Sequence, residues 1–134
     1  MIDTNIIVSA ALKPGGLQRA VLPLAITKPA RLYVSDAIVE EYREVLARPE
    51  LKIRRGLLQQ LLQLIRSHAH FITPTRPLQV ARDPEDNTFL ECADTARADY
   101  LVTGNQRNFR SSGRRLKVIS SREFIGIVAP HLIP

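Results

Sequence analysis

The sequence predicts a three-layer α/β domain, in which helices cover both faces of a central parallel sheet of four to five strands. Short apolar runs typical of buried strands alternate along the chain with longer segments of helical periodicity. Parallel strands of this kind are joined by right-handed crossovers whose helices cover both faces of the sheet. The 134 residues, 45% hydrophobic and 24% charged, have the size and composition of one globular domain over residues 1–134.

The expected elements follow one another in a regular order. Residues 1–2 precede Asp3, whose carboxylate is placed to cap the apolar run at 6–12. The strands are expected at residues 32–34, 70–72, 100–102 and 116–119. The helices are expected at residues 36 to about 48, 57–65, 86 onward and 121 onward. Pro49 stops the first of these helices, and Ser120 with Glu123 has capping-box spacing before the last.

Charge and cysteine content indicate which partners and which cellular compartment to expect. The formal net charge is +6, mostly from Arg, which favours nucleic acid as a partner. The single Cys92 permits no internal disulfide and lies in an apolar helical stretch, as expected of a small buried side chain in a reducing compartment. No run approaches the length of a membrane span, and no signal segment opens the chain. We therefore expect a cytoplasmic protein.

Three carboxylates are candidates for one pocket at the carboxyl ends of the strands. Helical geometry places Glu41 at the border of an apolar stripe and Asp86 in line with Leu90, so both can reach the core edge. The stripe beside Glu41 is formed by Ile38, Val39, Tyr42, Val45 and Leu46. Each has a structural alternative: Asp3 and Asp86 as helix caps, and Glu41 in a surface salt bridge. The remaining acids of these helices are expected on solvated faces: Glu40, Glu44, Glu91 and Asp94.

The candidate ligands favour a hard metal ion. Mg²⁺ prefers oxygen ligands in octahedral geometry and keeps several waters, which suits a few carboxylates. The three histidines have no Cys or His partner at ligand spacing and are expected to be structural or exposed: His68, His70 and His131. A zinc site is therefore not expected. Three short polar side chains are candidates to orient the carboxylates, with simple capping as the alternative: Thr4, Asn5 and Thr103.

Four motifs occur in order along the chain: DTN at 3–5, EYREVL at 41–46 after Ser35, DPEDNTFL at 83–90 and LVTGN at 101–105. In their order and spacing, they resemble the PIN domain family, in particular its toxins from toxin–antitoxin pairs. The resemblance implies an endoribonuclease dependent on Mg²⁺ or Mn²⁺ that leaves a 5′-phosphate and a 3′-hydroxyl. It places Asp3, Glu41 and Asp86 as its three acids, with Asn105 at a fourth position that is often Asp.

The predicted roles follow from this assignment. Asp3 and Asp86 would ligate the ion, Glu41 would complete the shell or orient the attacking water, and Asn105 would hydrogen-bond a water. A basic segment without acids is the candidate for holding RNA phosphates: Arg107, Arg110, Arg114, Arg115 and Lys117. The alternative is that this segment is a solvated loop without a binding role. The resemblance further implies a small antitoxin protein that inserts a basic side chain into the acidic pocket, and a homodimer.

Two departures from the family pattern leave alternatives open. Asn105 removes one negative charge from the pocket, which favours one-metal chemistry or weakened activity, and Met1 and Ile2 alone precede Asp3 where the family has more apolar residues. The first strand is accordingly short, or the true start lies upstream. A degenerate domain that binds RNA or a partner is the alternative function. A phosphatase of the haloacid dehalogenase type is disfavoured, because Asn5 stands where that chemistry needs a second Asp.

Overall fold

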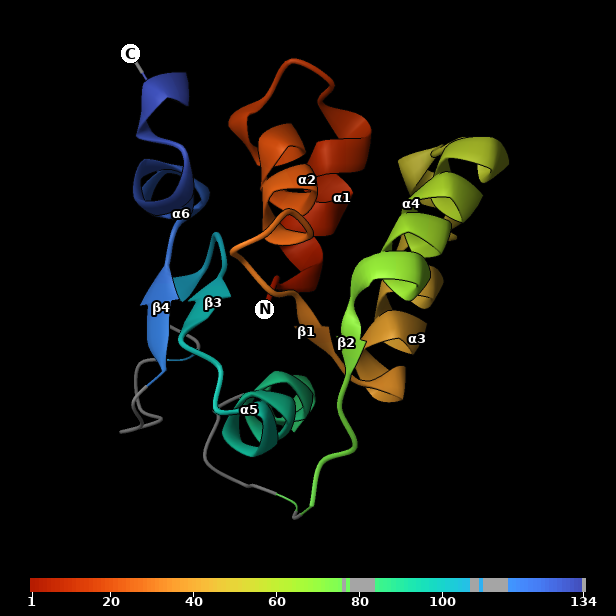
Figure 1. Cartoon of the computed structure of the whole chain (residues 1–134). Coiled ribbons are helices and arrows are strands. Elements are labelled where there is room, and N and C mark those ends of the chain that lie inside the picture. The colour runs from red at the N-terminus through yellow and green to blue at the C-terminus, as the bar shows by residue number, and fades with distance from the viewer. Residues whose placement is uncertain (76, 78–83, 107–108, 110–115, 134) are drawn as a thin grey trace.

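A computed structural model covers residues 1–134 and describes all of them except 76, 78–83, 107–108, 110–115 and 134 (Figure 1). The α-helices are α1 (Thr4–Leu12), α2 (Val21–Ala25), α3 (Asp36–Leu46), α4 (Arg55–His68), α5 (Pro84–Ala96) and α6 (Ser121–Val128). Short 3₁₀ turns are η1 (Leu17–Ala20), η2 (Pro49–Leu51) and η4 (Pro130–Leu132). The strands are β1 (Tyr33–Val34), β2 (His70–Phe71), β3 (Tyr100–Val102) and β4 (Lys117–Ile119). The described chain is thus a mixed α/β structure in which helices predominate.

The strands pair in parallel, as predicted, but they form two separate pairs. Strand β1 pairs with β2, and β3 pairs with β4 (Figure 1). Ile2 adds an isolated parallel bridge to Val102, and the amide of Asp3 donates to the carbonyl of Val102 at 2.8 Å. Residues 1–3 therefore run beside β3 at the edge opposite β4. The continuous sheet of four to five strands is not confirmed in the described part of the chain.

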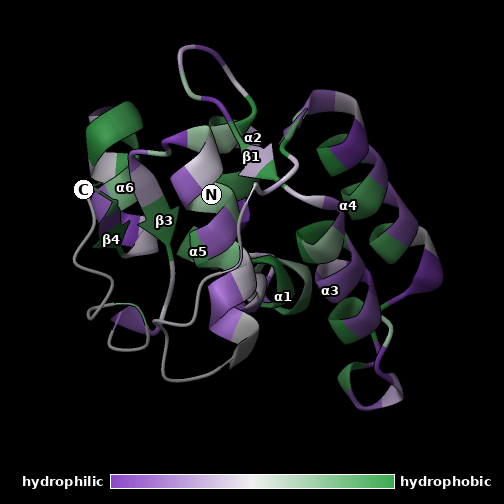
Figure 2. Cartoon of the chain, turned by 90° about the horizontal axis from the view of Figure 1, so that it is seen from below, coloured by the Kyte–Doolittle hydropathy of each residue, from purple (hydrophilic) through white to green (hydrophobic). Residues whose placement is uncertain are grey.

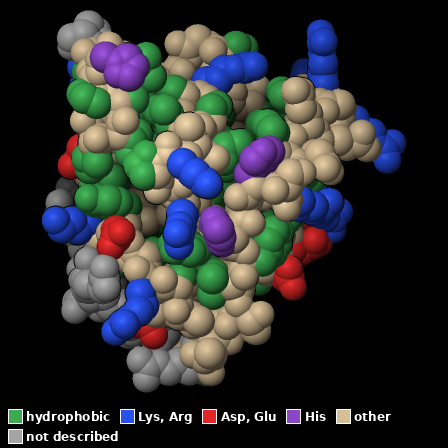
Figure 3. Space-filling model, viewed as in Figure 1, with side chains coloured by type: hydrophobic (Ala, Val, Ile, Leu, Met, Phe, Trp, Pro, Cys, Tyr) green, Lys and Arg blue, Asp and Glu red, His purple; other side chains and the backbone are tan. Residues whose placement is uncertain are grey.

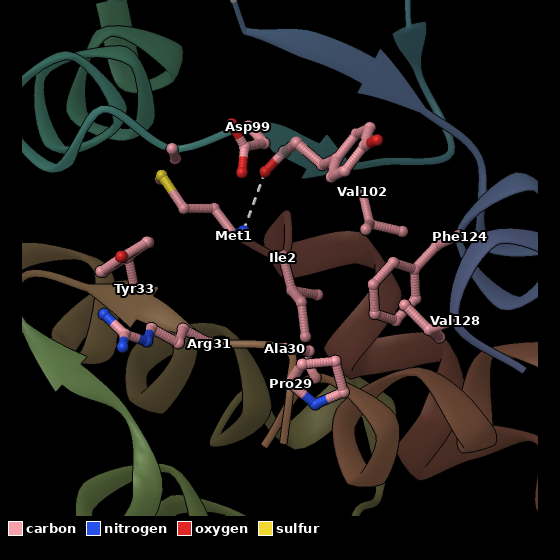
Figure 4. Close-up of a pocket in the computed structure, with 13 residues that line it drawn as sticks. Met1, Ile2, Pro29, Ala30, Arg31, Tyr33, Asp99, Val102, Phe124 and Val128 are labelled. Atoms are coloured by element: carbon pink, nitrogen blue, oxygen red, sulfur yellow. Dashed lines mark hydrogen bonds between the residues drawn. The ribbon is translucent and has the colours of Figure 1, made fainter. Parts of the chain in front are cut away.

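A cavity of about 470 Å³ lies where the two strand pairs would meet. Met1 and Ile2 line one side of it, and Arg31 and Tyr33 line the side that leads into β1 (Figure 4). The Met1 amino group is buried and donates to the carbonyl of Tyr100 at 2.9 Å. The segment before Asp3 thus uses its backbone groups on β3, and the cavity separates it from β1.

Local signals in the sequence account for most helix boundaries. Ser35 caps α3 by accepting a hydrogen bond from the amide of Ile38 at 3.2 Å, and the predicted capping box of Ser120 and Glu123 opens α6. Helix α3 ends at Leu46, slightly before the predicted stop, because the chain turns there into η2. The other two predicted helices are longer than expected, since α4 spans Arg55–His68 and α5 begins at Pro84.

The core lies between these helices and the strands. On α3 the buried residues are Ile38, Val39, Tyr42 and Leu46, which is the predicted apolar stripe except for half-buried Val45. On α4, Leu62 and Ile65 are buried, whereas Leu57, Leu58, Leu61 and Leu64 are half-buried. Figure 2 shows α3 and α4 side by side, with hydrophilic residues on the outer side of α4. Within the described ranges, none of the helices has the length and apolar character needed to cross a bilayer.

Candidate active site

Asp3 lies at the carboxyl end of the segment that pairs with β3, and its side chain is 8% exposed. It occupies the N-cap position of α1 with extended backbone angles, yet its carboxylate makes no capping hydrogen bond. Instead, Oδ2 of Asp3 accepts a hydrogen bond of 2.6 Å from the hydroxyl of Thr103. Asp3 therefore directs its carboxylate across to the end of β3 and does not act as a conventional cap.

Thr103 connects Asp3 to the loop that follows β3. Its side chain is fully buried, and its backbone amide donates to the carbonyl of Ile119 at 2.9 Å, which fixes its place beside β4. The hydroxyl that donates to Asp3 also accepts from the backbone amide of Asn105 at 3.0 Å. One hydroxyl thus orients the carboxylate and, at the same time, holds the backbone that carries Asn105. The Asn105 residue itself is exposed.

Glu41 is held to the same region by a second threonine. It is half-buried on α3, and the hydroxyl of Thr4 donates to its Oε2 atom. Thr4 is 6% exposed and directly follows Asp3 at the start of α1. The contact therefore joins α1 to α3 beside Asp3. The surface ion pair of α3 is made by Arg43 and Glu40, on the exposed side of the helix.

Asp86 lies in the first turn of α5 and is half-buried. Helix α5 packs against both β1 and α3. One turn after Asp86, the buried ring of Phe89 contacts the ring of Tyr42, with 6.5 Å between ring centroids. The structure thus brings Asp3 and Glu41 together and places Asp86 on an adjoining helix. Among the described residues, no group of three His, Cys, Asp or Glu side chains is arranged to hold a metal ion.

Burial sets the electrostatics of this region. Burial raises the pKa of Asp3 above its usual value, while the hydrogen bond from Thr103 and the amide of Thr4 act in the opposite direction. The pKa of the Tyr42 phenol lies well above its usual value, first because of burial and then because of the negative charges of Asp3 and Glu41. Both acids are therefore close enough to the phenol of Tyr42 to influence its ionisation. A cation beside them would offset the cost of burying negative charge.

Other predicted residues have varied positions. Asn5 is exposed at the start of α1, and Lys117 is exposed on β4. The remaining members of the predicted RNA-holding segment lie outside the described residues: Arg107, Arg110, Arg114 and Arg115. The three histidines are exposed, and Cys92 is buried as expected, with its thiol pKa raised by burial to about 11.

The solvated faces were predicted correctly for one helix and wrongly for the other. Glu40 and Glu44 of α3 are exposed as predicted. Glu91 and Asp94 of α5 are half-buried, so their prediction as solvent-facing was wrong. Glu91 lines a small hollow with residues at the ends of β1 and β2, because the chain after β2 passes over this side of the helix. This contact could not be predicted from the helical periodicity of α5 alone.

Tyr42 is a polar residue of this region that reasoning from the sequence did not identify. It was predicted only as part of the apolar stripe of α3, and its side chain is indeed 1% exposed. Its hydroxyl donates to the backbone carbonyl of Ile2, the residue before Asp3. A tyrosine within a buried stripe, next to a candidate acid, is a signal that its hydroxyl has a specific partner.

The chemistry of these side chains fits a hard divalent cation. Every candidate donor is an oxygen, from carboxylates, threonine hydroxyls or the Asn105 amide. Mg²⁺ is commonly held by one or two carboxylates, with waters and substrate phosphates completing its shell, so a pair of nearby acids with a third on the next helix meets that requirement. The donor set does not fit a zinc site of Cys and His ligands.

Comparison with known proteins identifies the family of the chain. An uncharacterized protein of Methanocaldococcus jannaschii is 26% identical over 137 residues, an alignment that covers 93% of this chain and 88% of the relative. A family model described as the PIN domain matches residues 1–107, which include Asp3, Glu41, Asp86 and Asn105. The match spans well over half of the chain. The chain therefore belongs to the PIN domain family, whose fold is generally that of a nuclease.

Proposed function

We propose that this protein is a metal-dependent endoribonuclease that hydrolyses RNA phosphodiester bonds. The observation that carries the proposal is the pairing of two acids with two threonines. The carboxylates of Asp3 and Glu41 are each held by a hydroxyl, from Thr103 directly after β3 and from Thr4 in α1. Burying a carboxylate is costly unless a charge or hydrogen bonds compensate it, so such an arrangement in a PIN domain favours a cation-binding role.

The metal would be Mg²⁺ or Mn²⁺, held by Asp3 and Asp86 with Glu41 completing the shell. When bound, such an ion supplies Lewis acidity toward water and the scissile phosphate. Thr103 keeps the carboxylate of Asp3 in one rotamer, and Thr4 does the same for Glu41. The side-chain amide of Asn105, which is exposed in the loop after β3, would hydrogen-bond a water or a phosphate oxygen. Its neutrality favours chemistry with one metal ion.

The charge of the chain supports RNA as the substrate. The formal net charge is +6, and phosphate contacts supply most of the affinity in sequence-independent binding. On the face shown in Figure 3, the described Lys and Arg side chains are dispersed over the surface and do not form a single patch. Lys117 and the arginines before it are proposed to hold the phosphates that flank the cleaved bond.

The biological setting is proposed from the resemblance of the motifs. We propose that the protein is the toxin of a toxin–antitoxin pair and acts as a homodimer. A small antitoxin protein would insert a basic side chain between the acids. The alternative is a degenerate domain that binds RNA or a partner without cleavage. The neutral Asn105 favours that alternative, as does the lack of a three-ligand group among the described residues.

Cleavage of a mixed RNA substrate tests the proposal. The purified protein is assayed with Mg²⁺, with Mn²⁺ and with EDTA, beside Asp3→Asn and Asp86→Asn. Glu44→Gln, which alters an exposed acid on α3, is the matched control. We expect cutting that requires metal, survives in Glu44→Gln and is lost in both Asp variants. RNA binding without cutting in either metal would instead support the degenerate domain.

A further inference from the structure

We infer that Tyr42 is a positioning residue, whose hydroxyl holds the Asp3 segment against α3 so that Asp3 and Glu41 face a common ion. The inference rests on the function proposed above and adds a residue that touches neither the ion nor the RNA. Tyr42 joins the segments of all three candidate ligands. Its hydroxyl donates to the backbone before Asp3, its own helix carries Glu41, and its ring contacts Phe89, one turn after Asp86.

The first contact replaces a missing sheet hydrogen bond. The carbonyl of Met1 accepts from the amide of Val102 at 2.9 Å, and the amide of Asp3 donates to the carbonyl of Val102 at 2.8 Å, so both of these groups are directed toward β3. The backbone groups of Ile2, between them, point to the side away from β3. The cavity lies on that side, between Ile2 and Tyr33. The hydroxyl of Tyr42 donates to the Ile2 carbonyl, a bond that a neighbouring strand would otherwise provide.

Tyr42 is also connected to both helices that carry the other candidate acids. Tyr42 directly follows Glu41 on α3, so the hydrogen bond of its hydroxyl ties the part of α3 that carries Glu41 to the segment before Asp3. Its ring contacts Phe89, which lies one turn after Asp86 on α5. A single buried side chain thus meets the segment of each candidate ligand.

The phenol is suited to a permanent donor role. The hydroxyl is buried and donates to a backbone carbonyl, and a tyrosine hydroxyl ordinarily carries its proton at neutral pH. The carbonyl of Ile2 can only accept a hydrogen bond, which matches a group that only donates to it. Because, within the described part of the chain, residues 1–3 pair with a strand on one side only, we expect the Asp3 backbone to depend more on this bond than a central strand would.

Tyr42→Phe tests the inference, because it removes the hydroxyl and keeps the ring that packs on Phe89. We expect the dissociation constant for Mn²⁺, titrated into metal-free protein, to rise roughly 10-fold, the scale on which residues behind metal ligands act. RNA cleavage should fall at limiting Mn²⁺ and recover largely at saturating Mn²⁺. Hydrogen–deuterium exchange at residues 1–5 of the metal-free protein should become faster.

Two controls separate positioning from general stability. Leu46→Val lowers packing on α3 one turn further along, at a fully buried side chain. Tyr33→Phe removes a phenol hydroxyl outside the acidic region, on β1. We expect both variants to bind Mn²⁺ with the affinity of the unmodified protein. This should hold for Leu46→Val even if its melting temperature is as low as that of Tyr42→Phe.

The outcomes for the inference and for the proposed function are distinct. If Tyr42→Phe binds Mn²⁺ as tightly as the unmodified protein, while Asp3→Asn does not bind it, the inference is wrong and the function stands. An equal loss of affinity in Leu46→Val and Tyr42→Phe also overturns the inference, because loosened packing then explains both. If the unmodified protein neither binds Mn²⁺ nor cuts RNA, both the function and the inference are wrong.

Discussion

The two ends of the three-residue segment at Met1–Asp3 are stabilised in different ways. At the carboxyl end, the hydroxyls of Thr103, Thr4 and Tyr42 donate respectively to Asp3, Glu41 and the Ile2 carbonyl. At the amino end, the same segment borders a cavity of about 470 Å³, and β3 is its one strand partner among the described residues (Figure 4). The difference shows that side-chain hydrogen bonds can position a candidate catalytic acid where the sheet is interrupted.

The largest expected effect comes from removing a hydrogen bond at the carboxyl end of the segment, where Asp3 lies. Thr103→Val keeps the shape of the side chain but removes the donor to Asp3 and the acceptor for the Asn105 amide. Leaving a buried carboxylate without this donor should lower the free energy of unfolding by about 1–3 kcal/mol. Metal affinity or cleavage should fall roughly 10- to 100-fold. Chemical denaturation and Mn²⁺ titration measure the two losses.

Thr27→Val is the matched control for that substitution. The Thr27 hydroxyl donates to the carbonyl of Pro23 at 2.6 Å on the exposed surface, far in sequence from either acid. We expect small changes in stability and none in metal affinity. Equal losses in the two variants would show that the buried contact with Asp3 has no special importance.

A smaller effect, opposite in sign, is expected from removing the buried charge. Burial raises the folded-state pKa of Asp3 above the unfolded value, so the folded state binds this proton more tightly. The associated stability is therefore full below the unfolded pKa and is lost as pH rises through the folded pKa. In EDTA at neutral pH, Asp3→Asn should consequently raise the melting temperature.

The same variant should respond differently to metal. Mn²⁺ should raise the melting temperature of the unmodified protein at neutral pH and much less at acid pH, where Asp3 is protonated. Asp3→Asn should show little of this metal-dependent rise. If Asp3→Asn is less stable than the unmodified protein in EDTA, the burial of Asp3 does not carry the cost that we assign to it.

The smallest expected effect comes from filling the cavity at the amino end of the segment. Ala98 is 3% exposed and lines the cavity, so Ala98→Val adds apolar volume where space exists. Each buried methylene contributes about 0.8 kcal/mol, and we expect a stability gain of at most roughly 1 kcal/mol. Metal affinity should stay unchanged, because the cavity lies at the opposite end of the segment from Asp3. Thermal denaturation with and without Mn²⁺ checks both points, and a loss of stability would indicate that the cavity walls cannot accept the added group.

Much of the fold was predictable because its signals are local. Ser120 caps the helix that it was expected to cap, Ser35 caps the helix expected from residue 36, and each run predicted as a strand contains one. The burial of Tyr42 and the exposure of Glu40 followed from helical periodicity. The interruption between β1 and the Ile2 segment was not predictable in this way, because pairing depends on which residues are opposite each other in space.

The candidate site was predictable in part. The motifs around Asp3 and Glu41 singled out two acids that do lie in one region, and they singled out Thr4 and Thr103 as side chains able to orient them. Nothing in the spacing assigned Thr4 to Glu41 and Thr103 to Asp3, since these partners are 37 and 100 residues apart in the chain. The half-buried positions of Glu91 and Asp94 likewise depend on tertiary contacts.

The sequence by itself determined the family, the parallel pairing and the oxygen-rich donor set, because residue types and short spacings encode them. The tertiary structure decided which polar groups meet. It assigned the Tyr42 hydroxyl to Ile2, the two threonines to two different acids, and the cavity to the place where a continuous sheet was expected. The physical reason is that a hydrogen bond depends on position and angle within a fraction of an ångström, which distant segments acquire only when they pack.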